Sequence, residues 1–381
     1  MFFFVAAIIV AAAGSAVTIK TLVGYNQLSL WFKFLVAGVV VAGWTAPMLT
    51  HLLRRAYGFL GGAYPYLYNL LYFLFGFAFI LFILLVIRDF LWFAGWHLSR
   101  LWTDSQVLNP RNPVLIGWAN VAVLVLSAVV SGWAVWEAVK IPAVKTVVFS
   151  SPKLDREYRL VLLNDLHLTR SSSLPRLEKI VALTNALKPE AVLLAGDIVD
   201  DRTRYLEPEI KALGKLKAPL GVYAVSGNHE LYNGLDLWLR NFRRHGFKVL
   251  MNSGEHLKNT RLYIGGIPDL NTAFSPFYQV DFKRTFKGSR HNDYRILLSH
   301  YPNLEKFADR DYDLQLSGHT HGGQIFPFHY LAWKANKYLA GRYRVGNYDL
   351  YVSRGAGYWG PPMRLLAPAE ITEIILKPQK K

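Results

Sequence analysis

Seven side chains that can bind a metal ion stand out in the C-terminal part of the sequence, because they cluster directly after short apolar runs. They are Asp165, His167, Asp197, Asn228, His300, His319 and His321. Carboxylate, amide and imidazole ligands suit Mn²⁺, Fe or Zn²⁺, and the chain contains no cysteine that could add a thiolate. Seven ligands are too many for one ion but fit two, and paired ions clamp the attacking and leaving oxygens of a phosphoryl group. The set therefore predicts phosphoryl chemistry at a two-metal site.

Taken singly, these matches have ordinary explanations. Asp165 and His167 could be a turn aspartate beside a surface histidine, and Asn228 could lie in a turn that needs positive φ. The pair His319 and His321 is the strongest single signal, because two imidazoles two residues apart at a strand end have few structural uses. Five such clusters after five apolar runs are hard to explain by chance, so we interpret them as one site.

The elements that must position these side chains are short apolar runs typical of buried strands. The runs are YRLVLLN, AVLLA, VYAVS, RILLS and DLQLS. Helical spacing predicts helices over residues 174–188, with Pro175 in the first turn, and over residues 235–246, ending at Gly246. Strands that alternate with helices indicate a layered α/β domain, whose ligand sites lie at the carboxyl ends of its strands. We therefore expect all five clusters on one rim.

The complete pattern D-x-H, G-D-x-x-D, G-N-H-E, H and G-H-x-H resembles that of the calcineurin-like metallophosphoesterase superfamily. The resemblance covers about residues 158–377, and the segments LSGHTHGGQIFP and SRGAGYWGPPMRLLAPAEITEI are similar to its bacterial membrane-associated branch. It implies a four-layer αββα sandwich, whereas the spacing alone indicates only a layered α/β domain. It also implies a metal-dependent phosphoesterase that cleaves phosphodiester or pyrophosphate bonds with two divalent ions.

The resemblance further implies roles for individual residues. It implies two ligand sets that share one carboxylate, namely Asp165, His167, Asp197 and His321 for one ion, and Asp197, Asn228, His300 and His319 for the other. His229 would protonate the leaving oxygen as a general acid, and Asp200 would orient its imidazole. Arg354 and Arg364, in the family-like tail, are candidates for contact with substrate phosphate.

The first 156 residues are rich in long apolar, aromatic stretches, which is typical of membrane-spanning helices. Four stretches are long enough to cross a bilayer, near Phe2–Ile19, Trp31–Leu53, Pro65–Ile87 and Val114–Trp136. A cleaved signal peptide is the competing interpretation of residues 1–17, but no basic segment precedes the apolar run. We therefore expect a transmembrane region of about four helices at 1–140, a linker at 141–156 and a metallophosphoesterase domain at 157–381.

The formal net charge of +17 favours anionic partners such as lipid headgroups or phosphorylated substrates. Nucleic acid is not expected as a partner, because no basic motif interleaved with aromatic residues is present. With the N-terminus inside and four crossings, Lys and Arg are slightly more frequent near the cytoplasmic ends of the spans. This balance favours a multi-pass protein of the inner membrane with a cytoplasmic catalytic domain.

A phosphoesterase joined to membrane spans is expected to act on a substrate that lies in the bilayer. The sequence resembles, in motifs and topology, the UDP-2,3-diacylglucosamine pyrophosphohydrolases, which cleave a lipid-linked pyrophosphate. The leading hypothesis is therefore a role in lipid metabolism, with manganese as a candidate metal and attack by a hydroxide that bridges the two ions. Two alternatives stay open: a membrane-tethered phosphodiesterase for soluble nucleotides or nucleic acid, and a membrane transporter or scaffold with a regulatory metal domain.

Overall fold

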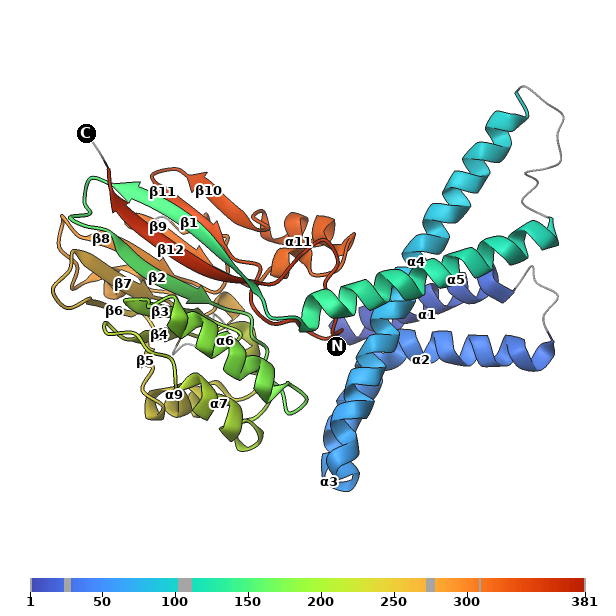
Figure 1. Ribbon diagram of the computed structural model, residues 1–381, viewed down its shortest axis with the longest axis horizontal. Coiled ribbons are helices and arrows are strands. Elements are labelled where there is room, and N and C mark those ends of the chain that lie inside the picture. The colour runs from blue at the N-terminus through green and yellow to red at the C-terminus, as the bar shows by residue number, and fades with distance from the viewer. Residues whose placement is uncertain (1, 24–28, 102–111, 272–277, 308–309, 380–381) are drawn as a thin grey trace. The chain divides into compact units, whose positions relative to one another are not determined.

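The computed structural model describes residues 2–23, 29–101, 112–271, 278–307 and 310–379. The chain divides into two compact units. Unit 1 comprises Met1–Trp136 with Gly360–Met363, and unit 2 comprises Glu137–Trp359 with Arg364–Lys381. The elements of both units are labelled in Figure 1. Unit 1 is helical, whereas unit 2 contains all the strands of the described chain.

Unit 1 consists of apolar helices that gather around the indole of Trp44. The helices are α1 (Phe2–Val23), α2 (Leu30–Arg55), α3 (Tyr57–Leu60), α4 (Tyr64–Ser99) and α5 (Pro113–Val139). The ring of Trp44 meets Phe75 and Phe82 of α4 edge to face, with centroids 6.2 and 5.6 Å apart. Gly14 of α1 lies against the same indole, where a Cβ atom would come within 2.5 Å of it. The small residue lets α1 approach the aromatic cluster that joins α2 to α4.

Three helices are long and apolar enough to cross a membrane, over Leu30–Arg54, Gly61–Ser99 and Pro113–Val139. The first of the four expected spans forms only a shorter apolar helix among the residues described, Ile8–Val23. Three of the four expected spans are therefore candidate membrane helices, and the fourth is not clearly one. The cytoplasmic orientation expected from the sequence assumes an even number of crossings, and it stays a prediction.

The first sheet of unit 2 carries the strands that precede the N-terminal motifs. In spatial order its strands are β1 (Ala143–Ser151), β12 (Glu370–Pro378), β2 (Tyr158–Leu163), β3 (Ala191–Ala195), β4 (Val222–Val225) and β5 (Lys248–Val249). Strands β2, β3 and β4 are parallel, so their carboxyl ends lie at the same edge.

Strand β1 corrects the expectation of a linker at 141–156, because most of that segment pairs in parallel with β12. Its side chains are mostly exposed or half-buried, and Phe149 is its one fully buried residue. A half-exposed strand at the edge of a sheet has no continuous apolar run, so a linker was expected there instead of a strand.

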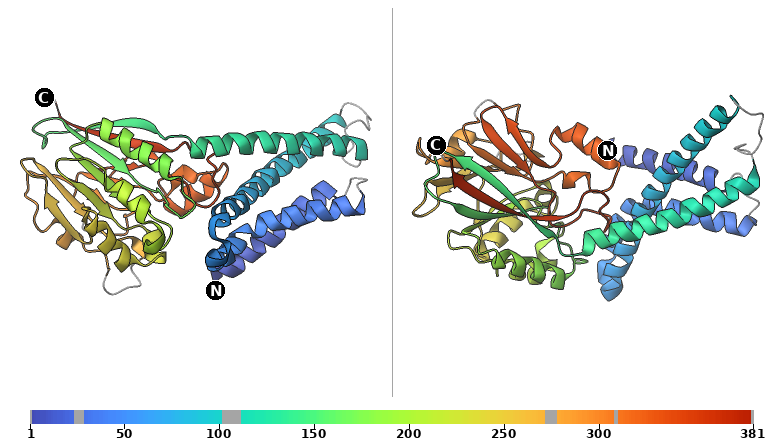
Figure 2. Two further views of the ribbon diagram at one scale, coloured as in Figure 1. Left: turned by 60° about the horizontal axis from the view of Figure 1, so that its bottom comes forward. Right: turned by 45° about the horizontal axis from the view of Figure 1, so that its top comes forward.

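The second sheet carries the strands that precede the histidine motifs. In spatial order its strands are β10 (Gly341–Val345), β11 (Tyr348–Val352), β9 (Leu314–Ser317), β8 (Tyr294–Leu298), β7 (Leu262–Gly266) and β6 (Ser253–His256). Strands β7, β8 and β9 are parallel. All five strands predicted before the polar clusters are present, but three belong to the first sheet and two to the second. Figure 2 shows both sheets of unit 2 from two further directions.

The two sheets share an apolar core, which explains why the predicted strands are apolar at every position. In β2, Leu160 and Leu162 join the core between the sheets, whereas Val161 and Leu163 join a second core on the opposite face. Successive side chains of a strand point to opposite faces, so a strand buried on both faces reads as an unbroken apolar run. The expected mixed α/β architecture is confirmed.

Helices cover the outer faces of the two sheets. The second core of the first sheet is closed by α6 (Leu174–Ala186), α7 (Glu207–Leu213) and α9 (Leu235–Arg244). The helices predicted at 174–188 and 235–246 are therefore confirmed as α6 and α9. On the side of the second sheet, Phe282 of α10 (Phe282–Phe286) packs in a third core. The last helix is α11 (Phe328–Asn336).

Candidate metal centre

The predicted ligands come from strand ends in both sheets of unit 2. From the first sheet, Asp165 and His167 follow β2, Asp197 follows β3, and Asn228 begins the short helix α8 (Asn228–Tyr232) after β4. From the second sheet, His300 follows β8, while His319 and His321 follow β9. The rim expected from the sequence is therefore shared by two sheets rather than built on one.

One group of ligand atoms is formed by Asp165, His167 and His321, whose ligand atoms all lie within 4.8 Å of one another. The two Nε2 atoms of His167 and His321 are 2.9 Å apart. His321 Nε2 is 3.8 Å from Asp165 Oδ1, and His167 Nε2 is 3.6 Å from Asp197 Oδ2. Three of the four residues of the first expected ligand set thus lie together, and the fourth, Asp197, lies beside His167.

A second group is formed by Asp197, His300 and His319, again within 4.8 Å. His300 Nε2 is 3.1 Å from Asp197 Oδ2 and 3.2 Å from His319 Nδ1. The Oδ1 atom of Asn228 is buried and has no hydrogen-bond partner among the described residues. A buried amide oxygen without a partner costs free energy, and a cation would satisfy it. Asp197 belongs to the second group, and its Oδ2 atom also lies 3.6 Å from His167 Nε2 of the first, so the residues present fit two ions that share one carboxylate.

The backbone at the site is strained. Five ligand residues, none of them glycine, have left-handed backbone conformations, with φ between 46° and 74°: Asp165, His167, Asp197, His319 and His321. Such a conformation costs about 1–2 kcal/mol per residue, and Asp and His tolerate it better than most residue types. Residues held in this way gather at functional sites. The strain therefore marks the same residues as the ligand geometry does.

The imidazoles of His167 and His319 are held in a form that can offer a lone pair, whereas at His300 burial lowers the pKa but the carboxylate of Asp197 outweighs it and raises the pKa. Burial lowers the pKa of His167 and of His319 to about 3, so both rings are neutral at physiological pH. His300 Nδ1 lies 2.9 Å from the main-chain oxygen of Ala195. Donation of an N–H there leaves Nε2 free for a metal, which is how a carbonyl behind a ligand histidine usually orients it.

Glu230 joins the loops that carry Asp197 and Asn228. It is fully buried, and its carboxylate accepts four main-chain N–H bonds, from Asp197 at 3.0 Å, Ile198 at 2.7 Å, Val199 at 3.0 Å and Gly227 at 2.7 Å. Burial raises the pKa of Glu230 to about 7, and the N–H donors act in the opposite direction. No role was expected for Glu230 from the sequence, although a Glu three residues after a helix N-cap is a known capping signal.

Gly227 is required by the closeness of these loops. A Cβ atom at Gly227 would lie 2.1 Å from Asp197 Oδ1 and 2.5 Å from the Asp197 main-chain nitrogen. No side chain fits there without moving the shared carboxylate. Gly318 has the same role on the second sheet, where a Cβ atom would come within 2.6 Å of Asp165 Oδ2.

His229 and Asp200 form an ion pair next to the ligands. His229 Nδ1 is 2.9 Å from Asp200 Oδ1, and a ring nitrogen of His229 also lies within 4.8 Å of ligand atoms of His167 and Asp197. Burial lowers the pKa of His229, but the carboxylates of Asp200 and Asp197 outweigh it and raise the pKa to about 9. The pair has the geometry of an acid and the group that orients it.

The two arginines expected to contact substrate differ in environment. Arg364 is fully buried, and its guanidinium donates to the main-chain oxygens of Gly357, Ala367, His321 and Arg354 at 2.7–3.2 Å. This burial favours a positioning role for Arg364 in place of the substrate contact that we expected. Arg354 is half-buried and lies beside Gly322, next to the ligand His321, so it stays a candidate for phosphate contact.

One more carboxylate near the ligands was missed from the sequence. Asp269 follows β7, is almost fully buried and accepts hydrogen bonds from the N–H and side-chain amide of Asn271 at 2.8 Å. Burial raises its pKa, while the charge of nearby His300 acts in the opposite direction. The preceding strand contains two glycines, so its apolar run was too short to draw attention to the aspartate after it.

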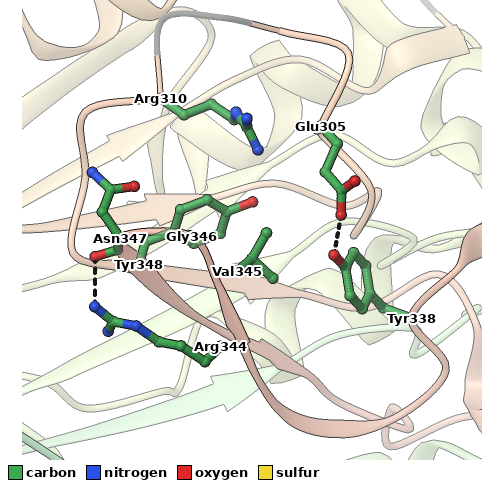
Figure 3. Close-up of a pocket in the computed structure, with 8 residues that line it drawn as sticks. All are labelled: Glu305, Arg310, Tyr338, Arg344, Val345, Gly346, Asn347 and Tyr348. Carbon is green, nitrogen blue, oxygen red and sulfur yellow. Dashed lines mark hydrogen bonds between the residues drawn. The ribbon is translucent and has the colours of Figure 1, made fainter.

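A pocket in unit 2 lies away from these ligands, against the β10–β11 hairpin (Figure 3). Its lining residues are Glu305, Arg310, Tyr338, Arg344, Val345, Gly346, Asn347 and Tyr348. Tyr338 donates to Glu305, and Arg344 donates to the main-chain oxygen of Asn347 at 3.0 Å. None of the predicted site residues lines it, so the ligand geometry, rather than a hollow in the surface, defines the centre.

Comparison with known proteins shows which family this chain resembles. A family model described as calcineurin-like phosphoesterase matches residues 158–323. An uncharacterized metallophosphoesterase of Campylobacter jejuni is 35% identical over 264 residues, which cover 68% of this chain and 70% of that protein. A transmembrane protein with metallophosphoesterase domain of Danio rerio is 34% identical over 275 residues, 68% of this chain but only 62% of its own length.

Two further similarities complete the comparison. An uncharacterized metallophosphoesterase of Helicobacter pylori is 34% identical over 249 residues, 65% of this chain and 67% of its own. A solved dimetal phosphatase of Danio rerio is 14% identical, and the alignment covers 55% of this chain and 90% of that chain. The TM-score is 0.35, which is too low to support a structural argument. The superfamily expected from the motifs is confirmed. The chain belongs to the calcineurin-like metallophosphoesterase family and is a phosphoesterase that depends on divalent metal ions.

Proposed function

We propose that this chain is a membrane-anchored phosphohydrolase that holds two divalent ions, Mn²⁺, Fe or Zn²⁺. One ion would be held by Asp165, His167, Asp197 and His321, and the other by Asp197, Asn228, His300 and His319. The observation that carries the proposal is the position of Asp197 Oδ2, 3.1 Å from His300 Nε2 in one group and 3.6 Å from His167 Nε2 in the other. Such ions, when bound, generate a nucleophile from water and neutralise phosphoryl oxygens.

His229 is proposed as the general acid. Its Nδ1 lies 2.9 Å from Asp200 Oδ1, an ion pair that would orient the ring so that Nε2 can present a proton to the leaving oxygen. Asp200 is itself held, since it accepts a hydrogen bond from the side-chain amide of Asn233 at 3.3 Å. The indole of Trp359 lies 6.1 Å from the His229 ring, centroid to centroid. The proton donor therefore has a hydrophobic residue at its side, where a leaving group would lie.

The proposed substrate is a lipid-linked phosphodiester or pyrophosphate such as UDP-2,3-diacylglucosamine. Three candidate spans in the same chain support a substrate within a bilayer, and the net charge of +17 suits an anionic one. Half-buried Arg354 would contact a phosphoryl oxygen, because its guanidinium can form paired hydrogen bonds with one. A catalytic unit that faces the cytoplasm would meet such a nucleotide-linked lipid, and this orientation is part of the proposal.

The test uses the full-length protein in detergent with Mn²⁺, supplied first with bis-p-nitrophenyl phosphate and then with UDP-2,3-diacylglucosamine. We expect hydrolysis of both, release of UMP and a lipid 1-phosphate from the second, and loss of both activities in Asn228→Ala and His229→Ala. Hydrolysis of the diester alone would keep the phosphohydrolase and refute the lipid substrate. Activity on neither substrate with Mn²⁺, Fe²⁺ or Zn²⁺ would favour a regulatory or scaffolding role instead.

A further inference from the structure

Helix α11 exposes large apolar side chains along its outer face. Phe328, Tyr330, Leu331 and Trp333 are 46%, 62%, 61% and 57% exposed. These four account for nearly half of a nine-residue helix. Single exposed apolar residues are normal on a protein surface, but a contiguous group of this kind marks an interaction site.

The inner face of α11 is the reverse of what an ordinary surface helix shows. The side chains buried against the rest of unit 2 are the small Ala332 and the polar Asn336, and Asn336 donates to the main-chain oxygen of Ala332 at 2.9 Å. A helix of a water-soluble domain turns its large apolar residues inward and its polar residues outward. Although the ring of Tyr330 contacts Phe326 and His329, the large side chains of α11 remain mostly exposed and are available to a partner outside unit 2.

The apolar surface continues from α11 toward the metal centre. Gln324 donates to the main-chain oxygen of Trp359 at 2.7 Å and accepts from its N–H at 2.9 Å. Ile325 pairs with Leu365 in an isolated bridge, which places the segment before α11 beside Leu366. Trp359 and Leu366 are 48% and 76% exposed. We call Phe328, Tyr330, Leu331, Trp333, Trp359 and Leu366 the α11 surface.

The charge around α11 identifies the kind of partner. Residues 314–348 contain no Asp or Glu, and Lys334 lies on α11 with Lys337 directly after it. Lys337 also pairs with Glu305, and Arg342 and Arg344 of β10 pair with Asp349. Aromatic and leucine side chains framed by cations are the pattern of a helix that lies in the headgroup region of an anionic membrane. Trp and Tyr prefer that depth, since one part of each ring is apolar and another can form hydrogen bonds.

We propose that the α11 surface inserts into the headgroup region of an anionic lipid bilayer. The candidate spans of the same chain bring a bilayer to the protein, so this contact would be a second, peripheral one made by the catalytic unit. Trp359 links the surface to the general acid, because its ring is 6.1 Å from that of His229. A lipid headgroup at this depth would reach the metal centre while its acyl chains stay in the membrane. That last step rests on the proposed function, whereas the insertion does not.

The experiment compares two exposed leucines on two helices of unit 2. The chain contains no cysteine, so Leu331→Cys and Leu237→Cys each give one site for a nitroxide spin label on the full-length protein. Leu237, on α9, is 54% exposed against 61% for Leu331. Both variants are placed in nanodiscs of phosphatidylcholine with phosphatidylglycerol, and collisions with dissolved oxygen and with a water-soluble nickel chelate are measured.

We expect the Leu331 label to collide more often with oxygen than with the chelate, and the Leu237 label to show the opposite preference. The same preference for the chelate at both sites would overturn the proposal. Protection of the Leu331 label from both reagents would also overturn it, because the surface would then be covered by protein, either the helices of unit 1 or a second copy of the chain.

A second measurement tests delivery of the substrate. The double variant Leu331→Ser with Trp333→Ser is expected to lose about tenfold or more of its rate on the lipid substrate in nanodiscs and to keep its rate on bis-p-nitrophenyl phosphate. An unchanged rate on the lipid, or an equal loss on both substrates, would contradict delivery through the α11 surface. Absence of diester hydrolysis in the unmodified protein would refute the proposed function instead, and the spin-label result would still decide whether α11 inserts.

Discussion

The two halves of the metal centre are held by opposite chemistry. In the half contributed by the first sheet, the carboxylate of Glu230 accepts four main-chain N–H bonds. In the half contributed by the second sheet, the guanidinium of Arg364 donates to main-chain oxygens on both sides of the loop that carries it. Loops that converge on a buried point leave main-chain groups without partners. In the first half, the carboxylate of Glu230 satisfies the free N–H groups. In the second half, the guanidinium of Arg364 satisfies the free carbonyl groups.

The comparison teaches that the ligands depend on residues that do not bind metal. Glu230 and Arg364 are both fully buried, and each holds several chain segments in one arrangement. The half with Glu230 also contains Asp197, which belongs to one ligand group and lies 3.6 Å from His167 of the other. We therefore expect changes in this half to have larger effects than changes in the half with Arg364.

The largest effect is expected for Asp197→Asn, which alters both ligand groups at once. Losing even an outer partner of a ligand costs about 10- to 100-fold, so weakening a ligand of both ions is expected to cost roughly 10⁴-fold in diester hydrolysis. Elemental analysis of the purified protein should show fewer than two ions per chain. The control is Asp349→Asn, whose carboxylate pairs with Arg342 and Arg344 on the second sheet. A fully loaded, active Asp197→Asn protein would refute the shared-ligand arrangement.

His229→Ala should reduce hydrolysis by about 10³-fold, the usual contribution of a positioned acid, with metal content unchanged. The loss should depend on the leaving group, because p-nitrophenolate leaves without a proton more readily than an alkoxide does. Rates for a p-nitrophenyl ester and an alkyl ester of the same phosphate measure this dependence. Asp200→Asn should show the same trend with a smaller loss, and equal losses for both esters would argue against an acid role for His229.

Glu230→Gln replaces an acceptor of main-chain N–H bonds by a side chain that also carries donors. One amide N–H would then face main-chain N–H groups, a mismatch that costs about 1–3 kcal/mol of stability. Metal affinity should fall about 10- to 100-fold, as it does when a group supporting a ligand is lost. Thermal unfolding with and without Mn²⁺ gives both quantities. Glu255→Gln, at a half-buried carboxylate bonded to Tyr223, is the matched control and should change neither.

Arg364→Lys is expected to have the smallest effect, about tenfold in metal affinity, because lysine keeps the charge but loses the planar fork of donors. Its counterpart is Arg354→Lys, in the half-buried position proposed to contact phosphate. The two variants should differ in kind: Arg364→Lys should lower metal content with little change in KM, and Arg354→Lys should raise KM at full metal content. A raised KM at full metal content in Arg364→Lys would restore the substrate contact first expected for it.

Much of unit 2 could be predicted from the sequence for a definite physical reason. Strands such as β2 and β3 are buried on both faces, so their apolar runs are unbroken and the polar residue that ends each run is conspicuous. Helices α6 and α9 were equally easy to predict, because each buries one stripe of apolar residues, such as Trp238 and Phe242 of α9.

Other features depend on contacts that spacing does not reveal. The division of the five strands between two sheets is decided by pairing over long sequence distances, as in β11 beside β9. Strand β1 alternates too weakly to be recognised at a sheet edge. Burial of Arg364 runs against the ordinary preference of arginine for the surface, and only the convergence of main-chain oxygens around it explains that position.

The left-handed backbone at five ligand residues also shapes which sequences can descend from this one. At those positions a new residue must tolerate a positive φ as well as provide the right chemistry. Asn and Gly are the replacements that accept positive φ most readily. A change of Asp165 or His319 to Asn would therefore disturb the shape of the loop less than a change to valine or threonine. Substitutions that abolish catalysis can therefore leave the fold intact. A homologue that has lost its activity would be expected to carry Asn or Gly at these ligand positions.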